Sequence, residues 1–244
     1  MIVAQDLAKH FGDVKAVNGI SFSVDDGMIT GLLGPNGSGK TTTLRMLYTL
    51  LQADSGSIEV DGINVSDNKL AVKQRLGVMP DARALYTRLS ARENIRYYGE
   101  LQGVSGDMLN QRVEELANQL EMQDYMDRRC HGFSNGQRAK VAIARAFVSN
   151  PQNMLLDEPG NGLDVMSNRG LRRFLLEQKA QGKAILLSTH IMQEVAALCD
   201  RIVIIANGRI KAAGSAEKLM EQSGKTNLED AFVTLIGTDE GLMA

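Results

Sequence analysis

The stretch that decides the fold is Gly34-Pro35-Asn36-Gly37-Ser38-Gly39-Lys40-Thr41. It fits the pattern G-x-x-x-x-G-K-[ST], in which glycines let the backbone curl until successive N–H groups converge on one anion. Lys40 supplies a positive charge that can reach the outer phosphates of a nucleotide. The Thr41 hydroxyl is a hard oxygen, which Mg²⁺ prefers as a ligand. The sequence therefore predicts a phosphate-binding loop that ends in Lys40, Thr41 and Thr42.

The residues on either side of this loop also fit a phosphate site. Residues 28–33 (MITGLL) have the pattern of a buried strand, and residues 42–48 (TTLRMLY) have the pattern of a helix. The N-terminus of such a helix faces the bound anion. The alternative is an ordinary glycine-rich turn before a helix. By itself, the motif indicates a P-loop NTPase and nothing more specific.

Length, charge and hydropathy narrow the class of protein. The chain has 244 residues and a formal net charge of -2. This length suits one core with an inserted subdomain, and the balanced charge gives no reason to expect nucleic-acid binding. No apolar run approaches the roughly 18 residues of a membrane span. Residues 1–6 lack the basic start of a secretory signal, so we expect no signal peptide.

The two cysteines indicate a reducing compartment. Cys130 and Cys199 are far apart and fit no metal-binding spacing, which favours a reduced, cytosolic chain. Cys130 lies beside His131 and could be a reactive thiol, but an ordinary free cysteine is the simpler interpretation.

The order of the predicted elements indicates an α/β fold with one helical interruption. Strands are predicted at 2–7, 20–24, 28–33, 57–62, 153–156, 184–188 and 201–206, and helices at 42–48, 91–101, 108–120, 137–149, 167–181 and 192–199. The alternation of strands and helices after residue 150 implies a largely parallel sheet covered by helices. We therefore divide the chain into a first core segment (1–80), a helical subdomain (81–150), a second core segment (151–220) and a C-terminal tail (221–244).

Acidic and imidazole side chains follow two of the predicted buried strands. Residues 154–158 read MLLDE, and ligands of parallel sheets bind at the carboxyl ends of strands. Asp157 is placed to support Mg²⁺, directly or through water, and Glu158 to polarise an attacking water. His190 follows the next strand and can contact a γ-phosphate. The alternatives are two acids that begin a loop at Pro159 and a solvated or structural histidine.

A second candidate anion site lies in the helical segment. Residues 133–137 read FSNGQ, and Ser134 can cap the helix that follows, with Gln137 completing a capping box. The box is a sufficient structural explanation. The same geometry also gathers helix N–H groups and the Ser134 hydroxyl around a point that could bind an anion. No phosphate from the first loop is assigned to this point, so we expect its ligand to come from another molecule.

Together these motifs resemble the ATP-binding subunits of ATP-binding cassette (ABC) transporters over nearly the whole chain. The resemblance rests on the Walker A-like residues 34–42, the signature-like residues 133–137 and the Walker B-like run that ends in Asp157 and Glu158. Residues 161–164 (NGLD) resemble the D-loop of the family, and His190 resembles its switch histidine. Phe11 lies where the family places an aromatic ring on adenine, and we assign Val17 to the same nucleotide site.

The resemblance implies a RecA-like P-loop core with an N-terminal antiparallel β subdomain and an inserted helical subdomain. It also implies a head-to-tail dimer that holds two ATP molecules with Mg²⁺. Lys40, Glu158 and His190 would be the catalytic residues, acting by positioning and charge stabilisation. Ser134 and Gly136 would contact the partner's γ-phosphate, with Gln137 in the same site. The helical subdomain would contact an integral membrane permease and hold the protein on the cytoplasmic face of the membrane.

Three positions depart from the family pattern. Asp81, in residues 78–83 (VMPDAR), stands where the family usually has the glutamine of its Q-loop. A carboxylate can bind Mg²⁺ more strongly than an amide oxygen, so Asp81 joins Thr41 and Asp157 as a candidate metal ligand; the alternative is a solvated loop acid. Asn135 replaces the first glycine of the signature, and asparagine tolerates left-handed backbone angles. Phe11 lacks a tyrosine hydroxyl but keeps the ring needed for stacking.

Two further segments indicate the type of transporter. Residues 80–86 (PDARALY) resemble the ATPase subunit of bacterial sodium-efflux ABC exporters, and residues 227–232 (NLEDAF) resemble the end of ABC-2-type export subunits. We therefore predict the ATPase subunit of an ABC-2 exporter, with sodium as the first candidate cargo. One alternative is the same subunit exporting a drug, lipid or polysaccharide. Another is a soluble ABC ATPase acting on ribosomes or DNA, which the single cassette and the lack of a basic patch disfavour.

Overall fold

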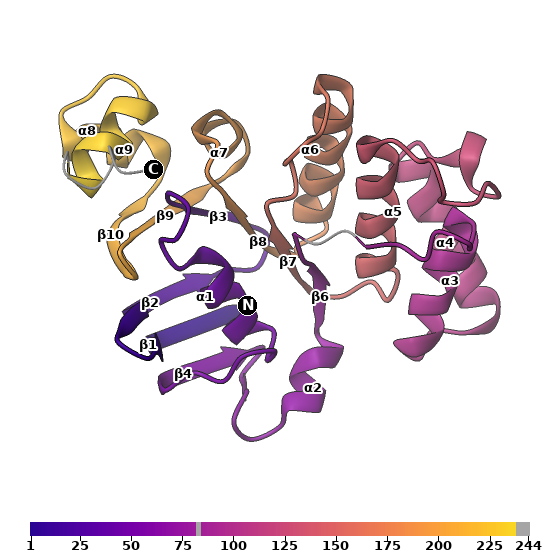
Figure 1. Cartoon of the computed structure of the whole chain (residues 1–244), viewed down its shortest axis with the longest axis horizontal. Coiled ribbons are helices and arrows are strands. Elements are labelled where there is room, and N and C mark those ends of the chain that lie inside the picture. Colours follow the sequence, from indigo (N-terminus) through magenta and orange to yellow (C-terminus); the bar gives the residue numbers. More distant parts are fainter. Residues whose placement is uncertain (82–83, 238–244) are drawn as a thin grey trace.

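Two β-sheets with helices around them form the framework of the computed structural model, which describes residues 1–81 and 84–237 (Figure 1). Ala82 and Arg83 of the predicted Q-loop segment lie outside the described residues, as do the last seven residues of the predicted tail. The mixed α/β architecture confirms the predicted fold class, with an antiparallel sheet beside a mainly parallel one.

The first sheet is antiparallel and has the strand order β2-β1-β4-β5. Its strands are β1 (Ile2–Phe11), β2 (Val14–Val24), β4 (Ser55–Val60) and β5 (Ile63–Asn64). The predicted strands at 2–7 and 20–24 cover only the parts of β1 and β2 that are rich in buried side chains. The remainder carries exposed residues such as His10 and Lys15, so its hydrophobic alternation is too weak to read from the sequence.

The second sheet has the order β10-β9-β3-β8-β7-β6 and contains the centre of the molecule. Its strands are β3 (Ile29–Leu33), β6 (Leu76–Met79), β7 (Asn153–Asp157), β8 (Ala184–Thr189), β9 (Arg201–Ala206) and β10 (Arg209–Gly214). All of them run parallel to their neighbours except β10, which is antiparallel to β9. Every residue of β3, β7 and β8 is buried, which explains why these strands appear as unbroken apolar runs.

Helices cover the sheets and form two lateral groups (Figure 1). The helices are α1 (Lys40–Leu47), α2 (Lys69–Gln74), α3 (Ala91–Leu101), α4 (Gly106–Gln119), η1 (Gln123–Tyr125), α5 (Asn135–Phe147), α6 (Val165–Ala180), α7 (Met192–Leu198), α8 (Ala216–Ser223) and α9 (Leu228–Ile236). Helices α3, α4 and α5 lie together at one end of the molecule, and α8 and α9 lie at the other. One apolar core joins α3, α4 and α5 to β7 and β8, so the helical group is anchored to the parallel sheet.

Several elements of the described chain were not predicted from the sequence. They are β5, α2, β6, β10, α8 and α9. Strand β6 has four residues, one of them Gly77, whose missing side chain makes room for Phe147 and Pro151. Strand β10 is an edge strand that is mostly exposed. The predicted boundary between residues 220 and 221 falls inside α8.

Candidate functional site

The predicted phosphate loop lies between β3 and α1, and two of its glycines are required by space. A Cβ on Gly34 would lie 2.2 Å from the carbonyl oxygen of Ile205, and one on Gly39 would lie 2.4 Å from that of Ala16. Gly39 also has a φ of 107°, a positive value that residues with a side chain rarely adopt. Helix α1 begins directly after it at Lys40, two residues earlier than predicted. The first turn of α1 therefore belongs to the phosphate loop.

Lys40 lies inside this loop. Its side chain is 6% exposed, and its Nζ donates to the carbonyl oxygens of Gly34 (2.8 Å) and Pro35 (3.3 Å). The same Nζ lies 3.5 Å from Glu158 Oε1. The positive charge is thus held between the curled backbone and the acid at the end of β7, where a phosphate group would meet both.

Hydroxyl oxygens gather around Asp157, which we predicted to support Mg²⁺. Thr41 Oγ1 donates to Asp157 Oδ1 at 3.3 Å, and Ser188 Oγ donates to the same oxygen at 2.5 Å. The parallel register pairs Asp157 with Ser188, which brings these side chains together. No local sequence pattern singles out Ser188. Hydroxyl and carboxylate oxygens fit Mg²⁺, which commonly takes one or two carboxylates with phosphates and waters.

Within the described ranges, 1–81 and 84–237, no group of three or more His, Cys, Asp or Glu side chains could hold a metal ion. Mg²⁺ commonly takes one or two carboxylates and completes its coordination with phosphate oxygens and water. That requirement suits a metal that arrives with a nucleotide, because Mg²⁺ keeps several of its waters and binds phosphates readily.

Glu158, predicted to polarise the attacking water, and His190, predicted as the switch histidine, are in direct contact. His190 Nδ1 lies 2.9 Å from Glu158 Oε2, and the two residues follow neighbouring strands, β7 and β8. The Glu158 backbone has a φ of 48°, and its N–H donates to both the carbonyl and the Oγ of Ser188 at 3.1 Å. These bonds hold Glu158 in a sparsely populated conformation, which is common at functional sites.

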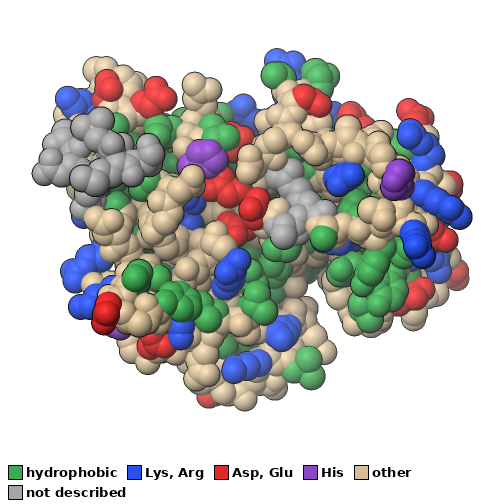
Figure 2. Space-filling view, in the orientation of Figure 1, with side chains coloured by type: hydrophobic (Ala, Val, Ile, Leu, Met, Phe, Trp, Pro, Cys, Tyr) green, Lys and Arg blue, Asp and Glu red, His purple; other side chains and the backbone are tan. Residues whose placement is uncertain are grey.

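A pocket of about 390 Å³ contains most of these groups. Its lining residues are Ala16, Asn36, Gly37, Ser38, Gly39, Lys40, Thr41, Thr42, Asp81, Glu158, Asn161 and His190. Figure 2 shows acidic side chains gathered beside a histidine on one face of the molecule. The structure therefore brings Asp81 to the same pocket as the Walker-like residues. Ala16 and Asn161 had not been assigned to it.

The predicted capping box at the start of α5 is present. Ser134 Oγ accepts from the N–H of Gln137 at 3.2 Å, and Gln137 Oε1 accepts from the N–H of Ser134 at 3.1 Å. Asn135 is the first residue of α5, so this position does not require the left-handed conformation that we considered for it. Ser134 and Asn135 are exposed, which leaves this helix start accessible to another molecule.

A second pocket, of about 420 Å³, connects the signature-like segment to the phosphate site. It is lined by Asp81, Ala84, Asn135, Arg138, Asn161 and Gly162. Asp81 and Asn161 line both pockets. Gly136 lies against α6 at the opposite side of the helix start, where a Cβ would lie 2.4 Å from Ser167 Oγ.

Phe11 and Val17 occupy different environments. Phe11 ends β1 with its ring 51% exposed, and Lys9 Nζ lies 5.8 Å from the ring centroid. Val17 is 1% exposed and packs in the core, so only its neighbour Ala16 lines the phosphate pocket. An open ring can stack on a base. The roles assigned to Phe11 and Val17 stay predictions.

Cys130 is an ordinary buried cysteine. It is 1% exposed, and burial raises the pKa of its thiol above the usual value. Reactive cysteines have lowered pKa values and accessible sulfur atoms. The simpler interpretation of this residue therefore agrees with its surroundings.

Comparisons with known proteins identify relatives of this chain. The family model described as ABC transporter matches residues 17–161. The ABC transporter ATP-binding protein NatA of Bacillus subtilis (strain 168) is 42% identical over 239 residues, which cover 96% of this chain and 97% of that protein. The Nod factor export ATP-binding protein I of Burkholderia lata is 38% identical over 217 residues, which cover 89% of this chain and 71% of that protein.

A solved structure gives the same result at the level of the fold. The structure of the ATP binding subunit of an ABC transporter matches with a TM-score of 0.89 at 30% identity, covering 97% of this chain and 100% of that one. Across residues 1–81 and 84–237, no helix is both long and apolar enough to cross a membrane.

Proposed function

The chain belongs to the ABC transporter family, and we propose that it powers an ABC-2-type exporter by hydrolysing ATP in the pocket between the phosphate loop and the ends of β7 and β8. Members of this family are ATP-binding proteins, and the chain is an ABC-type ATPase. The observation that carries the proposal is the convergence of Lys40, Asp157, Glu158 and His190 at one site, with the separations given above.

Each residue would have a distinct task in hydrolysis. Lys40 and the loop N–H groups hold the β- and γ-phosphates, and Thr41 and Asp157 supply oxygens to Mg²⁺, with Asp81 as a third candidate ligand. When bound, Mg²⁺ neutralises phosphate charge. Glu158 orients the attacking water and accepts its proton. His190 fixes the Glu158 carboxylate through their contact and faces the γ-phosphate.

A second copy of the chain would complete the nucleotide site. Ser134, Gly136 and Gln137 of one subunit would contact the γ-phosphate held by the Walker residues of the other. The exposed, capped start of α5 supports this proposal, because helix N–H groups and a serine hydroxyl suit an anion. The resemblance favours a homodimer in head-to-tail arrangement.

The helical subdomain, proposed as residues 81–150, would bind the permease. Exposed aromatic side chains support this assignment: Tyr86 is 50% exposed and Tyr97 is 42% exposed, and their rings meet edge-to-face at 5.5 Å. A shallow pocket of about 520 Å³ lies beside them. Aromatic residues are enriched in protein interfaces. Docking there would place the chain peripherally on the cytoplasmic face of the membrane.

The cargo is proposed from the resemblance alone. Residues 80–86 favour sodium efflux, and the chain retains Pro80 and Asp81 at that position. The relative named for Nod factor export supports a second candidate, in which the same subunit drives export of a drug, lipid or polysaccharide. A role on ribosomes or DNA would be revealed by co-purification of the full chain with those particles in place of an integral membrane protein.

The test of hydrolysis is Glu158→Gln, which keeps the size of the side chain and removes the base. We expect ATP binding to persist while turnover falls about 10²–10⁴-fold, as for loss of a general base. Steady-state phosphate release and nucleotide titration measure the two quantities. Glu229→Gln, an exposed acid on α9, is the matched control and should keep wild-type turnover. Turnover near wild type in Glu158→Gln would show that Glu158 is not the base.

A further inference from the structure

Glu194, in the first turn of α7, contacts the segment that carries His190. Its Oε2 accepts from Thr189 Oγ1 at 3.2 Å. The same hydroxyl oxygen accepts from the N–H of Ile191 at 3.1 Å. The Thr189 hydroxyl therefore links the Glu194 carboxylate to the backbone of Ile191. Thr189 and Ile191 are the two residues that flank His190 in the chain.

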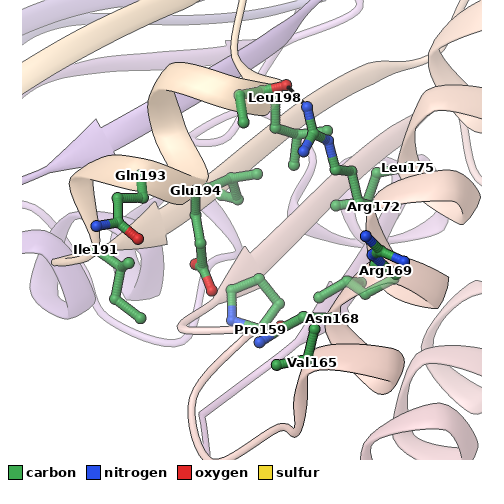
Figure 3. Close-up of a pocket in the computed structure, with 13 residues that line it drawn as sticks. Pro159, Val165, Asn168, Arg169, Arg172, Leu175, Ile191, Gln193, Glu194 and Leu198 are labelled. Atoms are coloured by element: carbon green, nitrogen blue, oxygen red, sulfur yellow. Dashed lines mark hydrogen bonds between the residues drawn. The ribbon is translucent and has the colours of Figure 1, made fainter.

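The other side of the Glu194 carboxylate meets the segment that carries Glu158. A Cβ built on Gly160 would lie 2.2 Å from Glu194 Oε1 and 2.9 Å from Cδ. The carboxylate thus fills the space that a side chain at position 160 would need. Figure 3 shows the Glu194 side chain extending from its helix toward Pro159. The Glu194 carboxylate therefore contacts both the segment that follows β7 and the segment at the end of β8.

Glu194 does not line the phosphate pocket. It lines a separate pocket of about 440 Å³ between α6 and α7, whose wall is mainly apolar and includes Pro159, Leu175 and Ile191. Burial raises the pKa of the Glu194 carboxyl, against the opposing effect of the Thr189 hydrogen bond, and the charge of Glu158 raises it further. Glu194 therefore lies near Glu158 and outside the lining of the phosphate pocket.

We propose that Glu194 is a positioning residue that fixes the Glu158–His190 pair for hydrolysis by bracing the segments that carry them. The proposal rests on the hydrolytic role of Glu158 proposed above. The pair must be held closely because a displacement of about 1 Å in a catalytic group can reduce a rate about 10²-fold. Removing the brace should slow the chemical step and leave the phosphate loop, which Glu194 does not contact, able to bind ATP.

The first test compares Glu194→Ala with Glu194→Gln in the full-length chain. In Glu194→Ala, kcat should fall about 10- to 100-fold while KM and the nucleotide affinity stay within about twofold of wild type. Glu194→Gln keeps an oxygen that can accept from Thr189, so it should recover most of the lost kcat. Gln193→Ala, on the exposed side of the same turn, is the matched control. Melting temperatures show that the variants are folded.

The second test asks whether Glu194 acts through Thr189. Thr189→Val removes the hydroxyl with little change in shape, so it should reproduce the loss in kcat and add little to Glu194→Ala in the double variant. It also carries the test if Glu194→Ala does not fold. Losses that multiply, a rise in KM with unchanged kcat, or wild-type kcat in both single variants would overturn the proposal. Glu158→Gln is measured in parallel, because normal turnover in that variant would instead overturn the role of Glu158.

Discussion

At the scale of single residues, several groups of the site contact the same carboxylate oxygen or the same ammonium group. Asp157 Oδ1 accepts from both Thr41 and Ser188, and Lys40 lies between the loop carbonyls and Glu158. Such shared contacts are not additive, so each substitution changes more than one interaction. Asp81 is the residue whose task is least constrained, because it is exposed while it lines the phosphate pocket.

The Asp81→Gln substitution restores the amide that the family usually has at this position. If Asp81 is a metal ligand, the Mg²⁺ concentration for half-maximal ATPase activity should rise about 3- to 10-fold, because a charged oxygen is replaced by a neutral one. A Mg²⁺ titration of steady-state turnover measures this change. Asp67→Asn, an exposed acid before α2, should leave the titration unaltered. The same midpoint in wild type and Asp81→Gln would identify Asp81 as a solvated loop acid.

At the scale of elements, the capped start of α5 has a role in local folding and a proposed role in assembly. Ser134 and Gln137 satisfy one another's backbone groups, which fixes where the helix begins. The same residues then present the helix N-terminus to solvent. The helix would begin here whether or not a partner exists, so the capping box alone could not establish the contact between subunits.

Ser134→Arg tests that contact, because a large cation at the helix start should block the approach of a second subunit. On a Glu158→Gln background, which slows hydrolysis, we expect ATP-dependent dimerisation to be lost while ATP binding to the single chain remains. Gel filtration with ATP measures the first property and nucleotide titration the second. Met108→Arg places the same charge on an exposed position of α4 and should still dimerise. An ATP-dependent dimer of Ser134→Arg would contradict the cross-subunit role.

The elements that could be predicted from sequence are those whose own residues show a clear pattern of burial or helix capping. The strands β3, β7 and β8 are buried along their length, and the capping box at Ser134 marks the start of α5. In contrast, β6 depends on Gly77 making room for residues far away in the chain. Glu194 was missed for the same reason, because its contact with Gly160 exists only after β7 and β8 have paired. Long-range packing of this kind leaves no local pattern.

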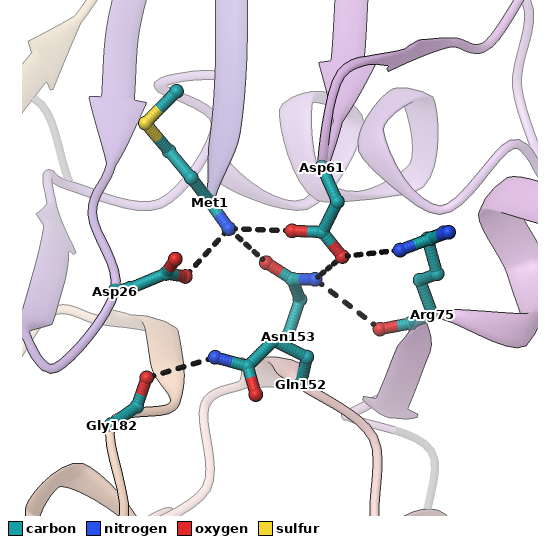
Figure 4. Close-up of polar contacts among 7 residues, drawn as sticks. All are labelled: Met1, Asp26, Asp61, Arg75, Gln152, Asn153 and Gly182. Atoms are coloured by element: carbon teal, nitrogen blue, oxygen red, sulfur yellow. Dashed lines mark hydrogen bonds and ion pairs between the residues drawn. The ribbon is translucent and has the colours of Figure 1, made fainter.

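At the scale of the whole molecule, polar contacts join the two sheets at the start of β1 (Figure 4). The Met1 ammonium donates to Asp26 (2.6 Å), Asp61 (2.7 Å) and Asn153 (3.0 Å), and Asn153 in turn donates to Asp61 at 2.9 Å. Burial lowers the pKa of this ammonium, but hydrogen bonds to Asp26 and Asp61 outweigh it and raise the pKa overall. Asn153 begins β7, so the contacts tie the antiparallel sheet to the strand that ends in Asp157.

Global stability should depend on the protonation of Lys183, which is 4% exposed and donates to Asn150. Burial, with a smaller effect of Arg112, lowers the pKa of Lys183 to about 8. An unfolded lysine stays protonated up to about pH 10.4, so between these values the unfolded chain binds more protons and stability rises with pH. From pH 7.5 to 9.5 this residue should add about 1–2 kcal/mol to the free energy of unfolding.

Denaturant titrations at these two pH values measure that gain. Lys183→Met removes the titrating group and keeps the length of the side chain, so the variant should lack the increment that the wild type shows. Other groups titrate in the same pH range. Their contribution is common to both proteins, so it cancels in the difference between the two pH dependences of the free energy of unfolding. Equal pH dependence in wild type and Lys183→Met would show that Lys183 keeps an ordinary pKa in the folded chain.

Glu158 and His190 directly follow two adjacent strands, whereas Ser134 lies at the start of α5 in the helical group. A swing of α3, α4 and α5 about the edge of the parallel sheet would carry Ser134 with it and leave the spacing of the catalytic pair unaltered, since β7 and β8 are hydrogen-bonded along their length. In the proposed dimer, such a swing would set how far Ser134 reaches toward the partner's nucleotide, while the paired strands would keep Glu158 and His190 together. Substitutions in α3, α4 or α5 could therefore change when the proposed site is completed and leave the spacing of the Glu158–His190 pair as it is.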